Sequence, residues 1–185
     1  MHTPTADSAS ALRGLRYRRP RQGDAASVHA LIEECKPLDL NSPYAYLLLC
    51  THFSDTSAVA EVNGMARGFV AGYLKPSAPS VLFVWQIAVG RDVRGHGIGA
   101  ALLQDVLSRP ACGDVRYLEA TITPSNQTSW ALFRSVARAR GARCHEAPLF
   151  RAEDFGGGDH EEEQLLRIGP FEGLEMLDDQ RYRPA

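Results

Sequence analysis

The sequence predicts an α/β (α+β) domain with a mixed central sheet of about six or seven strands and helices on both faces. Two apolar runs, residues 57–62 and 68–75, flank Asn63-Gly64, a pair that favours the positive φ angles of a tight hairpin turn. Later in the chain, strand-like and helical patterns alternate. Early hairpins combined with later strand–helix–strand crossovers predict antiparallel and parallel pairing in one sheet.

The first part of this domain is expected to contain one strand and two helices. We expect the strand over residues 15–19, the first helix over 23–35, where Gly23-Asp24 caps it, and the second helix over 44–53. Ser42 is a typical helix cap, and Pro43 suits the first helical position because its missing N–H has no partner there anyway.

The second part begins with a turn at residues 76–79 and a strand at 81–89. A helix follows over residues 98–108, because Ile98, Leu102 and Val106 recur at the four-residue spacing of a packed helix face. The remaining expected elements are a strand at 115–123, a helix at 126–140 ended by Gly141, and strands at 142–146 and 165–168.

The composition is that of an ordinary globular protein. The 185 residues are 44% hydrophobic and 23% charged, with a net charge of −2. That balance argues against a nucleic-acid or anionic-membrane binder. The chain has neither an apolar run of about 20 residues nor a signal-peptide pattern, so we expect a cytoplasmic protein.

The expected organisation is a single domain with short extensions. Residues 1–14 are interpreted as a disordered lead, 15–171 as the domain and 172–185 as a tail. The four cysteines form no Cys-x-x-Cys pair, so neither a disulfide scaffold nor a metal site is expected, and the thiols should be reduced and mostly buried.

The most informative segment is the glycine-rich run between the strand at 81–89 and the following helix. Gly95, Gly97 and Gly99 keep side chains away from the backbone, so a ligand can approach the N–H groups at the helix start. Arg91 and Arg94 add positive charge beside it. This pattern indicates an anion site for a nucleotide-like cofactor that carries a pyrophosphate.

The same segment also fits the dinucleotide fingerprint G-x-G-x-x-G/A, with Glu119 roughly 20 residues further on. We disfavour this interpretation for two reasons. Five residues separate Val89 from Gly95, whereas the fingerprint turns directly off its strand, and Glu119 lies within a strand instead of at its end. A purely structural glycine turn stays as a second alternative.

The pattern Arg94-x-x-Gly97-x-Gly99 after a strand resembles the acetyl-CoA signature of the GNAT acetyltransferase superfamily, and the resemblance covers about residues 15–170. It implies splayed strands that form an acetyl-CoA cleft, a strand backbone that pairs with pantetheine, and Asn126 on the pantetheine arm. Helix capping is the alternative role of Asn126. The implied cofactor-binding residues are Ile87, Ala88, Val89, Arg94, Gly95, His96, Gly97, Ile98, Gly99, Ala100 and Asn126.

One position departs from that superfamily. Many members carry a tyrosine seven residues after the asparagine, placed to protonate the departing thiolate, whereas this chain has Phe133. The acid is therefore another residue or solvent, and Tyr44 is a candidate for it.

Segments 38–46, 83–86, 121–126, 160–163 and 167–170 narrow the resemblance to the diaminobutyrate acetyltransferase family of ectoine biosynthesis. The resemblance implies transfer of the acetyl group of acetyl-CoA to the 4-amine of L-2,4-diaminobutyrate, with no metal and, as is common in the family, as a homodimer. The alternatives are acetylation of another small diamine or amino acid, and a non-catalytic CoA-binding protein.

Acetyl transfer to an amine requires groups that accept a proton and bind an ammonium ion, and carboxylates can do both. The attacking amine must lose a proton, which a positioned carboxylate can accept, and a second carboxylate can hold the other ammonium group. We assign the base to Glu163, with His160 orienting it or shuttling its proton, and the ammonium anchor to Asp39. Glu161 is the fallback for Glu163 and a further candidate for binding substrate. A solvated acidic cluster over 159–163 and a turn aspartate are the structural alternatives.

Other side chains are weaker substrate-binding candidates. Trp85 is expected either to form a pocket wall or to pack in the core. Tyr44 is expected to donate a hydrogen bond to substrate or to pack at a helix start. Asn41 and Thr123 are candidates for holding the substrate carboxylate.

Overall fold

The computed structural model describes residues 12–36, 38–156 and 160–171. Its centre is a seven-stranded sheet in the order β1-β2-β3-β4-β5-β7-β6. Only the contact between β4 and β5 is parallel. The strands are β1 (Arg16–Arg18), β2 (Ala58–Val62), β3 (Met65–Lys75), β4 (Ala78–Val89), β5 (Tyr117–Ile122), β6 (Cys144–Phe150) and β7 (Glu163–Ile168). The predicted mixed sheet is confirmed.

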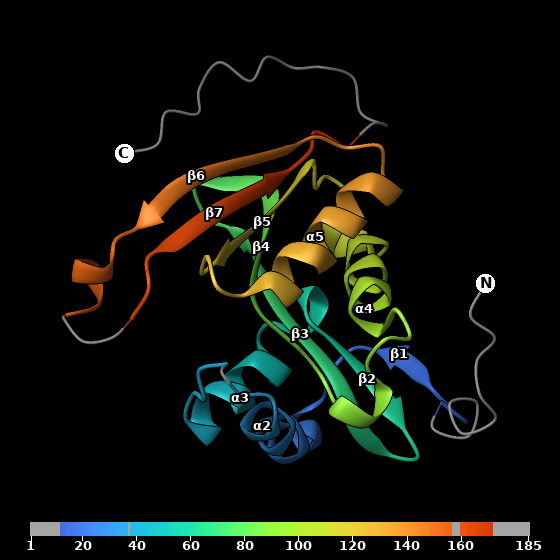
Figure 1. The fold of residues 1–185 in the computed structure, drawn as a ribbon. Helices are drawn as coiled ribbons and strands as arrows, with labels where there is room; N and C mark the ends of the chain where they lie inside the picture. Colours follow the sequence, from blue (N-terminus) through green and yellow to red (C-terminus); the bar gives the residue numbers. More distant parts are fainter. Residues whose placement is uncertain (1–11, 37, 157–159, 172–185) are drawn as a thin grey trace.

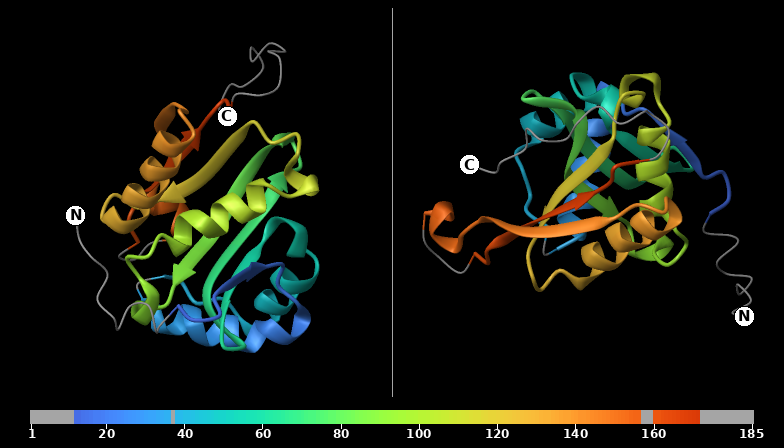
Figure 2. Two further views of the ribbon diagram at one scale, coloured as in Figure 1. Left: turned by 90° about the vertical axis from the view of Figure 1, so that its right-hand side faces the viewer. Right: turned by 90° about the horizontal axis from the view of Figure 1, so that it is seen from above.

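Helices cover both faces of this sheet (Figure 1, Figure 2). The α-helices are α2 (Ala25–Glu34), α3 (Pro43–Thr51), α4 (Ile98–Leu107) and α5 (Gln127–Ala139). Short 3-10 turns lie at η1 (Gln22–Asp24), η2 (Ser54–Thr56), η3 (Arg91–Val93), η4 (Pro110–Cys112) and η5 (Ala152–Phe155). The side chains of α2 and α3 share one core cluster, and those of α4 and α5 share another.

Strand alternation explains the two cores. Successive side chains of a strand point to opposite faces of a sheet. In β3, Phe69 and Ala71 pack with α2 and α3, whereas Val70 between them packs with α4 and α5. The sheet therefore separates two apolar layers: one packs against α2 and α3, and the other against α4 and α5.

Two local signals of the sequence are confirmed in atomic detail. The Ser42 hydroxyl accepts the N–H of Ala45 at 3.3 Å, and Pro43 is the first residue of α3. At the hairpin turn between β2 and β3, Asn63 and Gly64 have φ values of 51° and 81°. Both features depend only on neighbouring residues, and the sequence therefore reveals them.

Asp24 is the N-cap residue of α2, as the sequence predicts, but its side chain does not cap this helix. The Asp24 carboxylate makes no hydrogen bond to the first turn of α2, although it accepts the backbone N–H of Arg21 at 2.6 Å at the start of η1. It also accepts two hydrogen bonds from the guanidinium of Arg18, at 2.7 and 2.8 Å. This pairing lowers the pKa of the Asp24 carboxyl, and it connects β1 to the start of α2.

Several strand boundaries also differ from expectation; β3, for example, begins at Met65 instead of residue 68. β4 begins at Ala78 instead of residue 81, because the turn is short and Lys75 already pairs with Ala78. β6 continues to Phe150 instead of ending at 146. It is an edge strand whose side chains are nearly all exposed, so no alternation of apolar and polar residues marks its length.

The parallel contact at the centre of the sheet is short. Val81–Val84 of β4 pairs with Tyr117–Ala120 of β5, and β4 then continues for five more residues against β3 alone. The pairing of the two strands ends at Val84, and a cleft lies between the second half of β4 and α5. The predicted splay is therefore confirmed.

The ends of the chain fall largely outside the described residues. This applies to residues 1–11 of the predicted lead and to the predicted tail at 172–185, while Leu12 packs against the core formed with α4 and α5. Within the described residues, Cys35, Cys50 and Cys112 are buried, Cys144 is exposed, and all four are free. No helix in that part of the chain is long and apolar enough to cross a membrane.

Candidate active site

The glycine run forms the sharp turn that leads from β4 into α4. Gly95 and Gly97 have φ values of 80° and 74°, a left-handed conformation that favours glycine. Gly97 caps α4 with no side chain over the helix end, so the first N–H groups of α4 stay accessible. Gly99 serves packing, because a Cβ atom there would lie 3.1 Å from Leu132 of α5.

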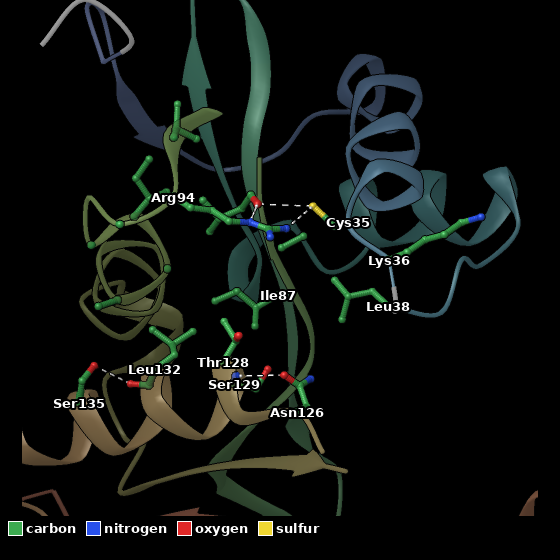
Figure 3. Close-up of a pocket in the computed structure, with 18 residues that line it drawn as sticks. Cys35, Lys36, Leu38, Ile87, Arg94, Asn126, Thr128, Ser129, Leu132 and Ser135 are labelled. Carbon is green, nitrogen blue, oxygen red and sulfur yellow. Dashed lines mark hydrogen bonds between the residues drawn. The ribbon is translucent and has the colours of Figure 1, made fainter. Parts of the chain in front are cut away.

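A cavity of about 350 Å³ lies beside this turn. It is bounded by the end of α2, the second half of β4, the glycine run and one face of α5 (Figure 3). The lining residues are Cys35, Lys36, Leu38, Ile87, Ala88, Val89, Val93, Arg94, Gly95, Gly97, Ile98, Gly99, Ala100, Asn126, Thr128, Ser129, Leu132 and Ser135. Of the predicted cofactor-binding residues, His96 alone does not line it; its Nδ1 lies 3.3 Å from the carbonyl oxygen of Val93.

The backbone of β4 does not present all its groups to the cleft. The N–H of Gly90 donates to the carbonyl of Arg67 in β3 at 2.8 Å. Hydrogen-bonded and non-hydrogen-bonded pairs alternate along an antiparallel ladder. In this register the backbone groups of Ala88 face β3, whereas those of Ile87 and Val89 face the cleft. The sequence predicts the same pantetheine-binding role for all three residues, whereas the strand register directs the backbone of Ala88 away from the cleft.

Arg94 brings positive charge into the cavity. Its Nε donates to the carbonyl oxygen of Val89 at 2.9 Å, and its Nη2 lies 3.6 Å from the Sγ of Cys35 (Figure 3). The guanidinium therefore extends from the glycine run across to β4 and α2. Together with the accessible N–H groups of α4, it makes this end of the cavity suitable for an anion.

Both roles considered for Asn126 are compatible. Its Oδ1 accepts the N–H of Ser129 at 3.1 Å and so caps α5, and the residue also lines the cavity. Phe133, in contrast, has 2% of its surface exposed and packs in the core, while Leu132 and Ser135 line the cavity in its place. The aromatic ring at 133 is a core residue in this structure.

The dinucleotide alternative finds no support at Glu119. This residue is fully buried in the middle of β5, where its carboxylate contacts Lys75 at 2.9 Å and Arg167 at 3.0 Å. It does not line the cavity beside the glycine run. A carboxylate engaged by two cations in this way is a structural ion pair, not a ribose ligand.

A second group of polar residues gathers around Glu163, at the start of β7. Its Oε2 atom is buried and has no hydrogen-bond partner among the described residues. Burial raises the pKa of the Glu163 carboxyl, the side-chain hydrogen bond from Thr121 opposes that rise, and His160 acts in the same direction as Thr121. Asp39 contributes to raising the pKa, so its negative charge also lies within electrostatic range.

Glu161 and His160, which were also predicted to lie near the substrate, differ in what they contact. Glu161 accepts hydrogen bonds from the N–H of Ser125, at 3.2 Å, and from its hydroxyl, so its carboxylate is already engaged. The ring of His160 stacks on Phe155, with centroids 3.8 Å apart, and its Nδ1 lies 2.7 Å from the carbonyl oxygen of Glu161.

Exposure distinguishes two further candidates. Trp85 has 50% of its surface exposed, so the expectation that it packs in the core is wrong. Tyr44 lies at the first turn of α3 with 66% exposed, and its ring is therefore on the surface instead of packed at the helix start. Thr123 follows β5, and its carbonyl accepts the indole N–H of Trp130 at 3.1 Å.

Three site-forming residues were not assigned from the sequence. Thr121 contacts Glu163 from the adjacent strand, and Tyr46 and Gln86 hold the loop at residues 38–42. The role of Thr121 could have been predicted from strand alternation, because Thr121 lies on the same face of the strand as the predicted site residue Thr123. Buried polar residues on an apolar helix and strand are the only signal for the other two.

The fold and the glycine turn define a GNAT-type cofactor cleft, and comparison with known proteins agrees. The sequence profile described as the Acetyltransferase (GNAT) family matches residues 25–137. The ribosomal-protein-S18-alanine N-acetyltransferase of Escherichia coli, 16% identical, has the same fold with a TM-score of 0.62, covering 91% of this chain and 99% of that one.

Much closer relatives share the sequence as well. L-2,4-diaminobutyric acid acetyltransferase of Bordetella parapertussis is 53% identical over 167 residues, covering 90% of this chain and 89% of that protein. The corresponding Chromohalobacter salexigens protein is 46% identical, covering 92% and 94%. The structure of diaminobutyrate acetyltransferase EctA from Paenibacillus lautus, with its substrate L-2,4-diaminobutyric acid and coenzyme A, is 40% identical with a TM-score of 0.84, covering 88% and 98%. The chain belongs to the GNAT acetyltransferases and, within them, to the L-2,4-diaminobutyric acid acetyltransferase family.

Proposed function

We propose that this protein transfers the acetyl group of acetyl-CoA to the 4-amine of L-2,4-diaminobutyrate, which gives N4-acetyl-L-2,4-diaminobutyrate for ectoine biosynthesis under osmotic stress. The observation that carries the proposal is the Oε2 atom of Glu163, a buried carboxylate oxygen with no hydrogen-bond partner among the described residues, within electrostatic range of Asp39. A polar atom left unpaired in this way suits a ligand that brings its own N–H donor. The family's named substrate has two such groups.

The cavity beside the glycine run suits acetyl-CoA. The first N–H groups of α4 and the Arg94 guanidinium are positioned to bind phosphate oxygens. The backbone groups of Ile87 and the N–H of Val89 face the cleft and are available to the amides of pantetheine, whereas the Val89 carbonyl already accepts Arg94 Nε. Asn126 lines the same cavity. Acetyl-CoA supplies the activated acyl group, and no metal is required for this chemistry.

Glu163 is the proposed general base. Its raised pKa brings the carboxylate nearer to neutral pH, where a base is more effective at removing a proton from an ammonium group. His160 lies within electrostatic range and is proposed to orient Glu163 or to pass its proton to solvent. Tyr44, exposed at the first turn of α3, is the proposed donor to the thiolate, because Phe133 has no proton to give.

The remaining roles concern substrate orientation. Asp39 is proposed to hold the ammonium group that does not react, and the half-exposed ring of Trp85 to form a wall of the acceptor pocket. Asn41 and Thr123 are proposed to hold the substrate carboxylate. Glu161 is a weaker candidate than Asp39 because Ser125 already engages its carboxylate.

Two wider properties belong to the same proposal. We expect a cytoplasmic protein, since acetyl-CoA and amino acids are found there, and a homodimer, as the family resemblance implies. Light scattering of the purified protein measures the second property directly. A monomeric mass at assay concentration would contradict it.

The proposed reaction is tested with the purified protein, acetyl-CoA and one of four amines: L-2,4-diaminobutyrate, diaminopropionate, ornithine or lysine. Release of CoA thiol gives the rate, and proton NMR of the product identifies the acetylated nitrogen. The proposal expects a clear preference for diaminobutyrate and the N4 product. Equal rates with all four amines favour a general diamine acetyltransferase, and CoA binding without turnover favours a non-catalytic CoA-binding protein.

A further inference from the structure

Two buried polar side chains, Tyr46 of α3 and Gln86 of β4, connect the cofactor strand to the loop at residues 38–42. Tyr46 is fully buried, and Gln86 has 8% of its surface exposed. The Tyr46 hydroxyl donates to Gln86 Oε1 at 3.2 Å and accepts the backbone N–H of Asn41 at 3.3 Å. Gln86 Nε2 donates to the backbone carbonyl of Asp39 at 2.8 Å. The pair therefore holds the loop at two backbone groups.

The described loop is otherwise held at its two ends, where Leu38 packs against the core of α2 and α3 and the Ser42 hydroxyl accepts the N–H of Ala45. Residues 39 and 40 are exposed, and the segment from 38 to 42 has neither helix nor strand structure. Burying polar groups in a core is costly unless they hydrogen-bond, and here the bonds are made to the loop backbone. An apolar pair at these sites would fill the same space without fixing the loop.

The same strand segment serves the cleft and the loop. Gln86 directly precedes Ile87, whose backbone faces the cofactor cleft, and its buried side chain reaches the loop from that strand. A single rigid strand thus sets the position of the loop relative to the acyl group. The Asp39 carboxylate, within electrostatic range of Glu163, belongs to that loop.

We infer that Tyr46 and Gln86 are positioning residues that hold Asp39 at a set place relative to the cleft, and thereby determine which of the substrate's two amines attacks. The inference rests on the proposed function, since only a substrate with two amines presents this choice. Misplacement of a reacting group by about 1 Å is enough to cost a large part of the rate. A displaced anchor therefore alters selectivity as well as affinity.

The direct test compares Tyr46→Phe and Gln86→Met with the wild-type protein. We expect the KM for diaminobutyrate to rise roughly tenfold for each variant, as loss of a buried hydrogen bond commonly gives. The fraction of N2-acetylated product should increase, while the KM for acetyl-CoA stays within about twofold of wild type, since the cavity beside the glycine run is untouched. Tyr73→Phe is the matched control, because this tyrosine packs against Phe83, away from the loop.

A second measurement separates positioning from general stability. If the pair acts through Asp39, then Tyr46→Phe adds little once Asp39→Asn is present, whereas additive losses overturn the inference. Unchanged selectivity and KM in both single variants, or equal increases of both KM values together with a lower melting temperature, overturn it as well. Failure of the wild-type protein to acetylate diaminobutyrate contradicts the proposed function itself, a result distinguishable from all of these.

Discussion

The carboxylate of Glu161 accepts hydrogen bonds from both the backbone N–H and the hydroxyl of Ser125, and so fastens the start of the β7 segment to the turn before α5. The two residues are 36 positions apart in the chain. Since Asn126 of the cofactor cavity follows Ser125 directly, this contact connects the acceptor side of the site to the cofactor side.

Loss of the hydrogen bond between Ser125 and Glu161 should weaken the connection between the two sides of the site but leave the residues proposed to catalyse acetyl transfer in place. We expect Ser125→Ala to raise the KM for diaminobutyrate a few-fold and to lower the free energy of unfolding by about 1 kcal/mol, because one exposed charged hydrogen bond is lost. Steady-state kinetics and urea denaturation measure the two effects. A fall in kcat as large as that of a Glu163 variant would show that Glu161 acts directly on the substrate.

Glu163→Gln is expected to lower kcat by about 10²- to 10⁴-fold, the range typical for loss of a general base. The affinity for acetyl-CoA should be unchanged, since Glu163 does not line the cofactor cavity. Stopped-assay kinetics and calorimetric titration with CoA provide both quantities. The neighbouring Glu162→Gln is the matched control, because that exposed carboxylate contacts only Gln164 among the described residues. Loss of CoA binding in Glu163→Gln would reassign the residue.

The raised pKa of Glu163 also predicts an effect on stability. A carboxyl whose pKa is higher in the folded state favours folding while it is protonated, and that contribution is lost as the pH rises through the folded-state pKa. At neutral pH the ionised group therefore opposes folding, and Glu163→Gln should raise the melting temperature while abolishing activity. Thermal melts at pH 5 and pH 8 measure this; we expect a larger gain at pH 8. A lower melting temperature at both pH values would contradict the prediction.

Asp39 should affect the pH profile of the reaction. Its negative charge contributes to raising the pKa of Glu163, so removing that charge in Asp39→Asn lowers the pKa. The acidic limb of kcat against pH, where the base becomes protonated, is then expected to shift to lower pH. The KM for diaminobutyrate should rise at the same time, because the ammonium anchor is weakened. An unchanged limb together with an unchanged KM would remove Asp39 from the site.

The glycine turn can be tested at Gly97. Gly97→Ala introduces a side chain at a φ of 74°, which costs roughly 1–2 kcal/mol of strain, although a Cβ atom there meets no neighbour. We expect weaker acetyl-CoA binding as well, because the turn carries the N–H groups of the anion site. Gly141→Ala is the matched control: Gly141 has a φ of 60° and open surroundings but ends α5 outside the cavity. Equal CoA affinity in the two variants would contradict the role of the turn.

The sequence predicts those features that depend on neighbouring residues. The Ser42 cap, the Asn63-Gly64 turn and the glycine run are each complete within a few positions, and each is found in the structure. Aspartate is a residue type that favours helix caps, yet the carboxylate of Asp24 binds Arg18 of the preceding strand β1. A single-residue pattern carries no information on that competition.

The part of the site around Glu163 is harder to predict, because its contacts join residues that are far apart in the sequence. Thr121 and Glu163 meet because β5 pairs with β7, and Tyr46 reaches Gln86 from a helix 40 residues earlier in the chain. The acidic run over 159–163 looks uniform in sequence. The structure gives Glu161 a partner, and it leaves one oxygen of Glu163 buried with no hydrogen-bond partner in the described part of the chain. Strand pairing and burial, which act over long separations, create these differences.

The buried ion pairs of Glu119 provide the last prediction. Its carboxylate lies between Lys75 of β3 and Arg167 of β7, and it joins strands on either side of β5. Glu119→Gln keeps the shape but removes the charge between two cations, and loss of one partner of a buried pair commonly costs about 3–5 kcal/mol. We expect a strongly lowered melting temperature with an unchanged affinity for acetyl-CoA at 15 °C, as measured by calorimetry. Selective loss of cofactor binding in a stably folded Glu119→Gln protein would instead support a ribose-binding role, and with it the dinucleotide alternative.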